Sequence, residues 1–81
     1  MTAEQLELEV DEQNVNPYWM VFARLHGVDS ERPTREDKAS FMGWIQRQWT
    51  ACPLETYAPF GDRRRWMLAH LAGLIEQQEA A

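Results

Sequence analysis

The chain of 81 residues contains a single cysteine, Cys52. One cysteine cannot form an intrachain disulfide, so the sequence excludes a disulfide-stapled fold and is typical of a reducing compartment. No apolar run approaches the roughly 18 residues that a membrane-spanning helix needs, and no segment has the pattern of a signal peptide. We therefore expect one small domain in the cytoplasm that makes no membrane contact.

The sequence also lacks the motifs of catalysis and of metal or cofactor binding. His26, His70 and Cys52 do not have the spacing of a zinc site, and no glycine-rich loop is present to hold a phosphate. Cys52 lies on an apolar stripe just before a proline, where a small core residue is expected rather than a nucleophile. We therefore predict no catalytic residues, no metal ligands, no cofactor and no small-molecule substrate.

Basic residues are absent from residues 1–14, whose five acidic residues account for the whole net charge of −5. Apolar and acidic residues alternate over residues 6–10, which favours a strand, whereas Thr2 with Gln5 fits a helical capping box. No other segment of the chain is predicted to be a strand that could pair with this one. We therefore predict an acidic N-terminal arm over residues 1–14 that is extended or weakly ordered, either solvated or ordered by a partner.

The rest of the chain carries start and stop signals of helices. Asn16 is a favoured N-cap, Pro17 suits the first helical position, and Gly27 supplies a left-handed stop, so the first helix is predicted from Asn16-Pro17 to His26. Thr34 begins the second helix, whose apolar residues recur at spacings of three and one. Its predicted buried stripe is Phe41, Trp44, Ile45, Gln48, Trp49 and Cys52.

Pro53 is predicted to end the second helix, because proline disfavours helical geometry in the residue before it. Residues 53–61 are predicted to form a loop that still buries side chains, among them Leu54 and Tyr57. Asp62 is predicted to cap a third helix that runs to about Gln78. The sequence thus predicts an all-α fold, with a small three-helix domain over residues 15–81 behind the acidic arm.

Three consecutive arginines, Arg63, Arg64 and Arg65, lie at the start of the third predicted helix, where the helix dipole disfavours positive charge. Arginine donates forked hydrogen bonds to carboxylates and phosphates, so these side chains are predicted to contact an acidic partner. Two alternatives stay open. In the first, the arginines are structural, and they either pair with the acidic arm or cover apolar surface. In the second, they bind nucleic acid, although the connection between the predicted second and third helices is too long for a helix-turn-helix.

Four tryptophans are more than a three-helix core of this size needs. Tryptophan and arginine dominate the energetics of protein interfaces. Trp19, Trp44 and Trp49 are therefore predicted to contact a partner protein or a second copy of the chain. The alternative is that these side chains form a bulky core with partial exposure.

One sequence pattern over roughly residues 16–49 resembles a known group of proteins. The pattern consists of Asn16-Pro17-Tyr18, Ala23, His26-Gly27, Phe41-Met42-Gly43-Trp44-Ile45 and Trp49. In these residues the chain resembles a loose group of small proteins encoded by bacteriophages and prophages. The acidic arm and the arginine-rich third helix are not part of the pattern.

The resemblance carries over no catalytic residue, and it implies a phage accessory protein in the bacterial cytoplasm that binds a host protein. We therefore expect a non-enzymatic protein-binding module that inhibits or modulates a host protein or defence complex. The alternatives are a nucleic-acid-binding accessory protein that uses Arg63–Arg65, and a homo-oligomeric structural component of a phage.

Overall fold

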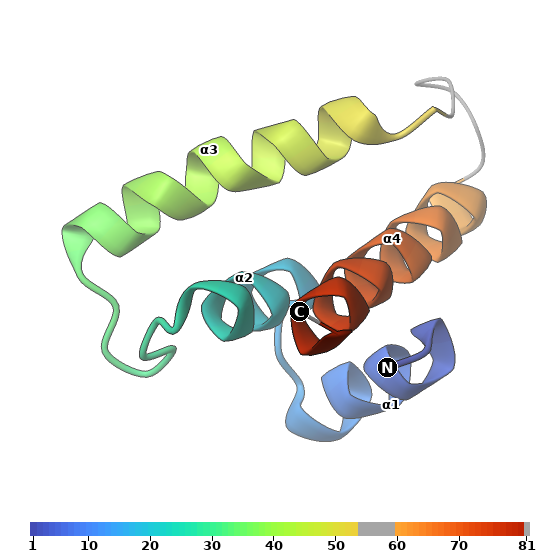
Figure 1. Cartoon of the computed structure of the whole chain (residues 1–81), viewed down its shortest axis with the longest axis horizontal. Coiled ribbons are helices and arrows are strands. Elements are labelled where there is room, and N and C mark those ends of the chain that lie inside the picture. The colour runs from blue at the N-terminus through green and yellow to red at the C-terminus, as the bar shows by residue number, and fades with distance from the viewer. Residues whose placement is uncertain (54–59, 81) are drawn as a thin grey trace.

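The computed structural model describes residues 1–53 and 60–80 and shows an all-α fold (Figure 1). Within these residues the chain forms four helices: α1 (Ala3–Gln13), α2 (Pro17–His26), α3 (Arg35–Ala51) and α4 (Phe60–Ala80). The all-α prediction is confirmed, and α2, α3 and α4 are the three helices predicted after the arm. The burial predicted for Leu54 and Tyr57 lies outside the described residues.

The segment predicted as an extended arm forms helix α1 instead. The Gln5 backbone N–H donates to the Thr2 hydroxyl at 3.2 Å, and the Thr2 N–H donates to the Gln5 side chain at 2.8 Å. This is the capping box that the sequence allowed. Leu6 and Val10 lie one turn apart on α1 and are buried, because α1 packs against α4 and α2. The prediction of an extended or weakly ordered arm over residues 1–14 is therefore wrong, since an apolar surface in the same chain orders the helix.

The predicted caps of α2 and α3 are confirmed. The Asn16 side chain accepts hydrogen bonds from two backbone N–H groups in the first turn of α2, at 2.8 and 3.3 Å. Gly27 follows α2 with a φ of 65°, in the left-handed region that favours glycine. Thr34 and Asp37 form a reciprocal capping box at the start of α3.

The start of α4 differs from the sequence prediction. The helix begins at Phe60, so Asp62 lies within its first turn rather than at its cap. There the Asp62 carboxylate accepts a hydrogen bond from Arg65 at 3.2 Å, one turn further along. The helix also extends to Ala80 rather than ending near Gln78.

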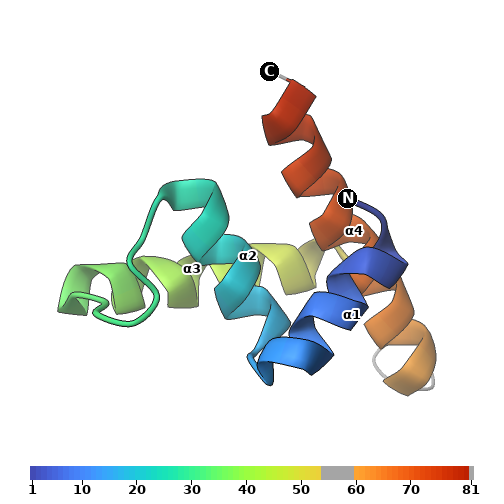
Figure 2. The same cartoon turned by 90° about the horizontal axis from the view of Figure 1, so that it is seen from below.

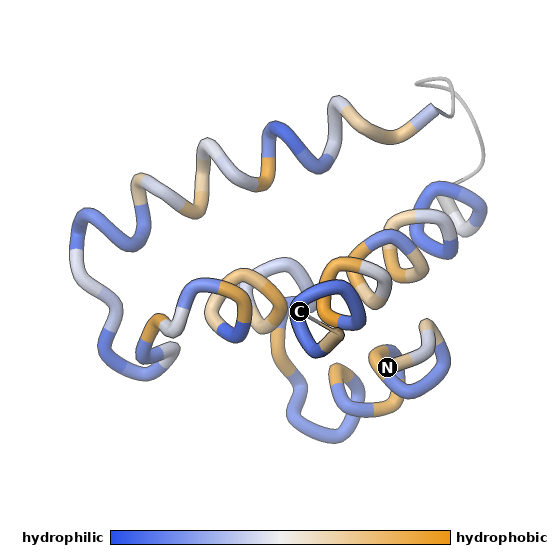
Figure 3. The backbone as a smooth tube through the Cα atoms, viewed as in Figure 1, coloured by the Kyte–Doolittle hydropathy of each residue, from blue (hydrophilic) through white to orange (hydrophobic). Residues whose placement is uncertain are grey.

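Helix α4 is the centre of the core. It packs against α1 and α2, whereas α3 packs mainly against α2 and lies along one side of the molecule (Figures 1 and 2). Figure 3 shows hydrophobic residues gathered where α1, α2 and α4 face one another. The largest fully buried side chains are Leu6, Val21, Phe22, Met67, Leu71 and Ile75. Within the described ranges, each helix is either too short or too polar to cross a membrane.

Candidate protein-binding surface

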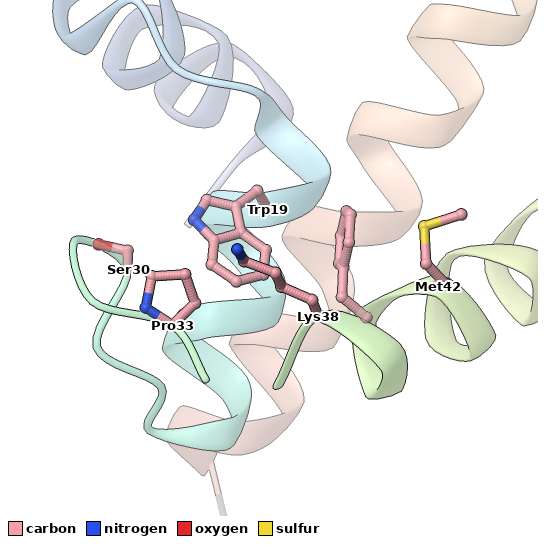
Figure 4. Close-up of a pocket in the computed structure, with 6 residues that line it drawn as sticks. Trp19, Ser30, Pro33, Lys38 and Met42 are labelled. Atoms are coloured by element: carbon pink, nitrogen blue, oxygen red, sulfur yellow. The ribbon is translucent and has the colours of Figure 1, made fainter. Parts of the chain in front are cut away.

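A pocket of about 330 Å³ opens between α2, the connection that follows it, and the first half of α3 (Figure 4). Trp19 comes from α2, Ser30 and Pro33 come from the connection, and the rest of the lining comes from α3. We call it the Trp19 pocket, and its lining residues are Trp19, Ser30, Pro33, Lys38, Phe41 and Met42.

Aromatic packing holds the two rings that form the apolar floor of the Trp19 pocket, those of Trp19 and Phe41. The Trp19 and Phe41 rings meet edge to face, with centroids 5.1 Å apart and planes at 87°. Both rings also pack against the buried Phe22, at centroid distances of 5.8 and 5.4 Å. Such contacts restrict the rotamers of both rings, so the apolar floor of the pocket exists before any ligand arrives.

The rim of the Trp19 pocket is more exposed and more polar than its floor. Met42 is 62 % exposed, the largest fraction among the exposed large hydrophobic residues of the described chain. Lys38 and Ser30 are also exposed, and they offer an ammonium group and a hydroxyl group at the mouth. Methionine adapts its shape to varied apolar surfaces. The arrangement therefore suits an apolar side chain that enters between Trp19 and Phe41 with polar groups beside it at the rim.

Trp44, which the sequence predicts as a partner contact, is a core residue. Only 5 % of its surface is exposed, and its ring packs against Phe22 at 5.5 Å and Phe41 at 6.2 Å. A side chain this buried offers almost no area to another protein. Trp44 therefore does not form part of the candidate surface, because its side chain lies on the stripe of α3 that packs against α2.

Trp49 and Arg63 lie together, at the end of α3 and the start of α4. The Arg63 guanidinium carbon lies 4.9 Å from the centre of the Trp49 ring, within the range of a cation–π contact. Trp49 also packs against Tyr18 of α2, with ring centroids 5.7 Å apart. Both contacts join helices within the chain, so they contribute to its tertiary packing.

Arg64 and Arg65 also contact acidic groups of the chain itself. Arg64 Nε lies 3.9 Å from the Glu7 carboxylate of α1, and Arg65 Nη2 lies 3.2 Å from the Asp62 carboxylate. Exposed pairs of this kind contribute little to stability, about 0–1 kcal/mol. The Arg64 contact shows nevertheless that the acidic α1 lies beside the arginines, one of the alternatives that the sequence left open.

The phenol of Tyr18 lies in the field of these arginines. Burial raises the pKa of Tyr18, and the positive charges of Arg64 and Arg63 oppose that rise. A further contact joins α4 to α3, where His70 Nε2 lies 2.8 Å from Gln48 Oε1, at hydrogen-bond distance. The contacts of Tyr18, Trp49, Arg63 and His70 thus connect α2, α3 and α4.

The structure therefore divides the six predicted contact residues into three groups. Trp19 lines the pocket, Trp44 is in the core, and Trp49 lies with the arginine cluster. The sequence analysis missed Ser30, Pro33, Lys38 and Met42 as lining residues. Met42 carried a usable signal, because it is a large apolar residue on α3 that lies off the stripe buried against α2.

Among the described residues, no three histidine, cysteine, aspartate or glutamate side chains come together as they would to hold a metal ion. No known protein family, curated protein or solved structure matches the chain.

Proposed function

We propose that this chain is a non-enzymatic protein-binding module that holds an apolar side chain of its partner in the Trp19 pocket. The observation that carries the proposal is the combination of a fixed aromatic floor with the exposed Met42 at the rim. Tryptophan, phenylalanine and methionine are enriched at protein interfaces, and hot spots are typically aromatic side chains in well-packed pockets.

The size and the rim of the pocket favour a protein ligand over a free small molecule. Small-molecule sites have volumes of roughly 300–1,000 Å³ and cover most of their ligand, so about 330 Å³ is at the lower end. The exposed rim residues Lys38 and Met42 would contact the surface around an inserted side chain. A side chain that projects from a folded partner or a peptide uses both the floor and the rim.

More specifically, we propose that the partner is a host bacterial protein and that the chain inhibits or modulates it in the cytoplasm of the phage host. This form depends on the sequence resemblance to phage-encoded proteins. Nucleic acid is the less favoured partner, because Arg64 of α4 lies beside Glu7 of α1. Helix α1 carries five acidic residues and no basic residue. Those carboxylates would repel the phosphates that the arginines attract.

The experiment is an affinity capture from bacterial lysate with the full chain, in halves with and without nuclease. Three baits are compared: the wild type, Ser30→Tyr, which adds a ring at a lining position of the pocket, and Gln13→Tyr, which adds a ring at an exposed site of α1. We expect one stoichiometric protein on the wild type and on Gln13→Tyr in both halves, and at least a tenfold loss on Ser30→Tyr. Circular dichroism verifies that all three baits fold.

Retention on Ser30→Tyr equal to that of the wild type would refute the pocket as the binding site. Retention that disappears with nuclease would favour nucleic-acid binding through Arg63–Arg65 instead. The activity of the captured protein is then titrated with the purified chain. Unchanged activity at saturation would overturn the proposed inhibition or modulation, while leaving the binding itself intact.

A further inference from the structure

The Trp19 pocket carries a single charged group, the ammonium of Lys38. Of the eight lysine and arginine residues of the chain, only Lys38 is a lysine. It lies on α3, and it is the only one of the six lining residues with a formal charge. Figure 4 shows its side chain extending from α3 toward the ring of Trp19. The ammonium group is therefore directed toward the apolar floor of the pocket and not away from it.

Two donors of the pocket are unused within the described residues. The Lys38 ammonium forms no ion pair or hydrogen bond there, and the indole N–H of Trp19 forms no hydrogen bond. Both groups can donate a hydrogen bond and neither can accept one. An acceptor on the ligand would therefore satisfy them, and the positive charge favours a carboxylate over a neutral carbonyl, because charge-assisted hydrogen bonds are the stronger ones.

Two carboxylates close to the pocket in sequence are engaged by backbone groups. Asp37 directly precedes Lys38, and its carboxylate accepts a hydrogen bond from the Thr34 backbone N–H at 2.9 Å. In the connection, the Asp29 carboxylate accepts from the Glu31 backbone N–H at 3.0 Å. These hydrogen bonds hold both carboxylates on the cap of α3 and on the turn before it, and neither residue lines the pocket.

The other charged residues of this region leave the pocket side of α3 positive. Glu31 and Arg32 are exposed next to each other in the connection and have opposite charges. Arg35 is exposed three residues before Lys38, on the same side of α3. Glu36 lies about 200° around the helix from Lys38, on the opposite side. Lys38 and Arg35 thus attract a negative group to this side of the helix.

The place of the ammonium beside an apolar floor decides which carboxylate of a partner it can reach. In an extended peptide, successive side chains point to opposite sides, so an acidic residue next to the inserted apolar residue points away from the pocket. In a helix, the neighbours on the same face are three or four residues away, with about 5–6 Å between Cβ atoms. A carboxyl-terminal residue carries its side chain and its carboxylate on one Cα atom, so it presents both groups to one pocket.

We infer that the Trp19 pocket binds the carboxyl-terminal residue of the partner protein, with an apolar side chain between Trp19 and Phe41 and the terminal carboxylate at Lys38. The inference rests on the proposed function and names the part of the partner that the pocket recognises. A partner whose chain continues beyond this residue lacks the carboxylate at that position, and with it the contact to Lys38.

The test titrates the full chain with three acetylated peptides as probes. The first has the sequence Gly-Ser-Gly-Leu with a free terminal carboxylate, and the second has the same sequence with a terminal amide. The third, Gly-Asp-Leu-Gly with a terminal amide, carries its carboxylate on an internal side chain. Two-dimensional NMR reports the indole N–H signals of the four tryptophans separately, and isotope-labelled lysine gives a single Cε signal, that of Lys38.

We expect the peptide with the free carboxylate to bind about fivefold more tightly than its amide, because only the carboxylate forms a charge-assisted contact. The Trp19 indole signal and the Lys38 Cε signal should shift together, whereas the indole signal of the buried Trp44 should not move. Lys38→Gln should lower the affinity for the free carboxylate to that for the amide. Arg35→Gln is the matched control, since it removes an exposed cation of α3 that does not line the pocket, and it should keep the preference.

Equal affinities of the first two peptides would overturn the inference, and so would a preference that survives Lys38→Gln. Both results leave the proposed function intact, because the apolar side chain still binds. Binding of the third peptide as tightly as the first would also overturn the inference, since an internal acidic residue would then suffice. If no peptide shifts the Trp19 signal at millimolar concentration, the pocket takes no apolar side chain, and the proposed function fails together with the inference.

Discussion

Two leucines of α1 provide a sharp test of how this helix is held. Leu6 is 0 % exposed and Leu8 is 60 % exposed, although both lie on the same helix and carry the same side chain. Leu6→Ala removes the equivalent of three buried CH₂ groups, worth about 0.8 kcal/mol each, and leaves a cavity against α4. We therefore expect a loss of about 2–5 kcal/mol in the free energy of unfolding. A domain of 81 residues has only about 4–12 kcal/mol in total.

Urea denaturation followed by circular dichroism measures this loss. The Leu6→Ala midpoint should fall by at least about 0.7 M, given a slope of about 1–3 kcal/mol per M. Leu8→Ala should change the free energy of unfolding by less than about 0.5 kcal/mol, because the side chain is already largely in water. Equal effects of the two substitutions would refute the packing of α1 on α4 and would support a solvated arm over residues 1–14.

Three further outcomes follow from local geometry and charge. Gly27→Ala should lower the free energy of unfolding, measured by thermal denaturation, by about 1–2 kcal/mol. The added Cβ would meet no atom within 4 Å, so the loss comes from the φ of 65°, which is unfavourable for alanine. Thr34→Ala should cost about 1 kcal/mol by removing the capping box of α3, whereas Thr34→Ser should largely preserve it. Burial raises the pKa of Tyr18 above its ordinary value of 10.0. The unfolded chain therefore loses this proton first as the pH rises, and stability that is full below pH 10.0 falls as the pH passes through the folded pKa. In melting curves over that range, Tyr18→Phe should lose less stability than the wild type; parallel losses would contradict the burial of the phenol.

The features predicted correctly from the sequence are those fixed by neighbouring residues. Asn16, Gly27 and Thr34 satisfy backbone groups or adopt backbone angles within a few residues of their own position, so a short stretch of sequence contains the whole cause. The capping box at Thr2 was recognised for the same reason. The choice between helix and extended arm failed because it depends on α4, which covers Leu6 and Val10 from far along the chain.

The candidate surface was only partly predictable for a similar reason. Trp19 and Trp44 are both tryptophans, a residue type that is common in protein interfaces. Whether each side chain is exposed, however, depends on how α2 crosses α3. The crossing buries Trp44 and leaves Trp19 half-buried at the edge of the pocket. Ser30 and Pro33 line the pocket because the connection between α2 and α3 passes beside it. The spacing of apolar residues in the sequence does not predict the path of a connection.

The central place of α4 has a consequence for how the chain is made. Synthesis proceeds from α1 to α4, so the helix that packs against α1 and α2 emerges from the ribosome after both of them. At roughly 5–20 residues per second, the apolar faces of α1 and α2 remain without their main packing surface for several seconds. The first fifty residues cannot form the native core in advance. Nascent chains stalled before Phe60 should therefore be protease-sensitive, and protection should appear only once α4 has emerged.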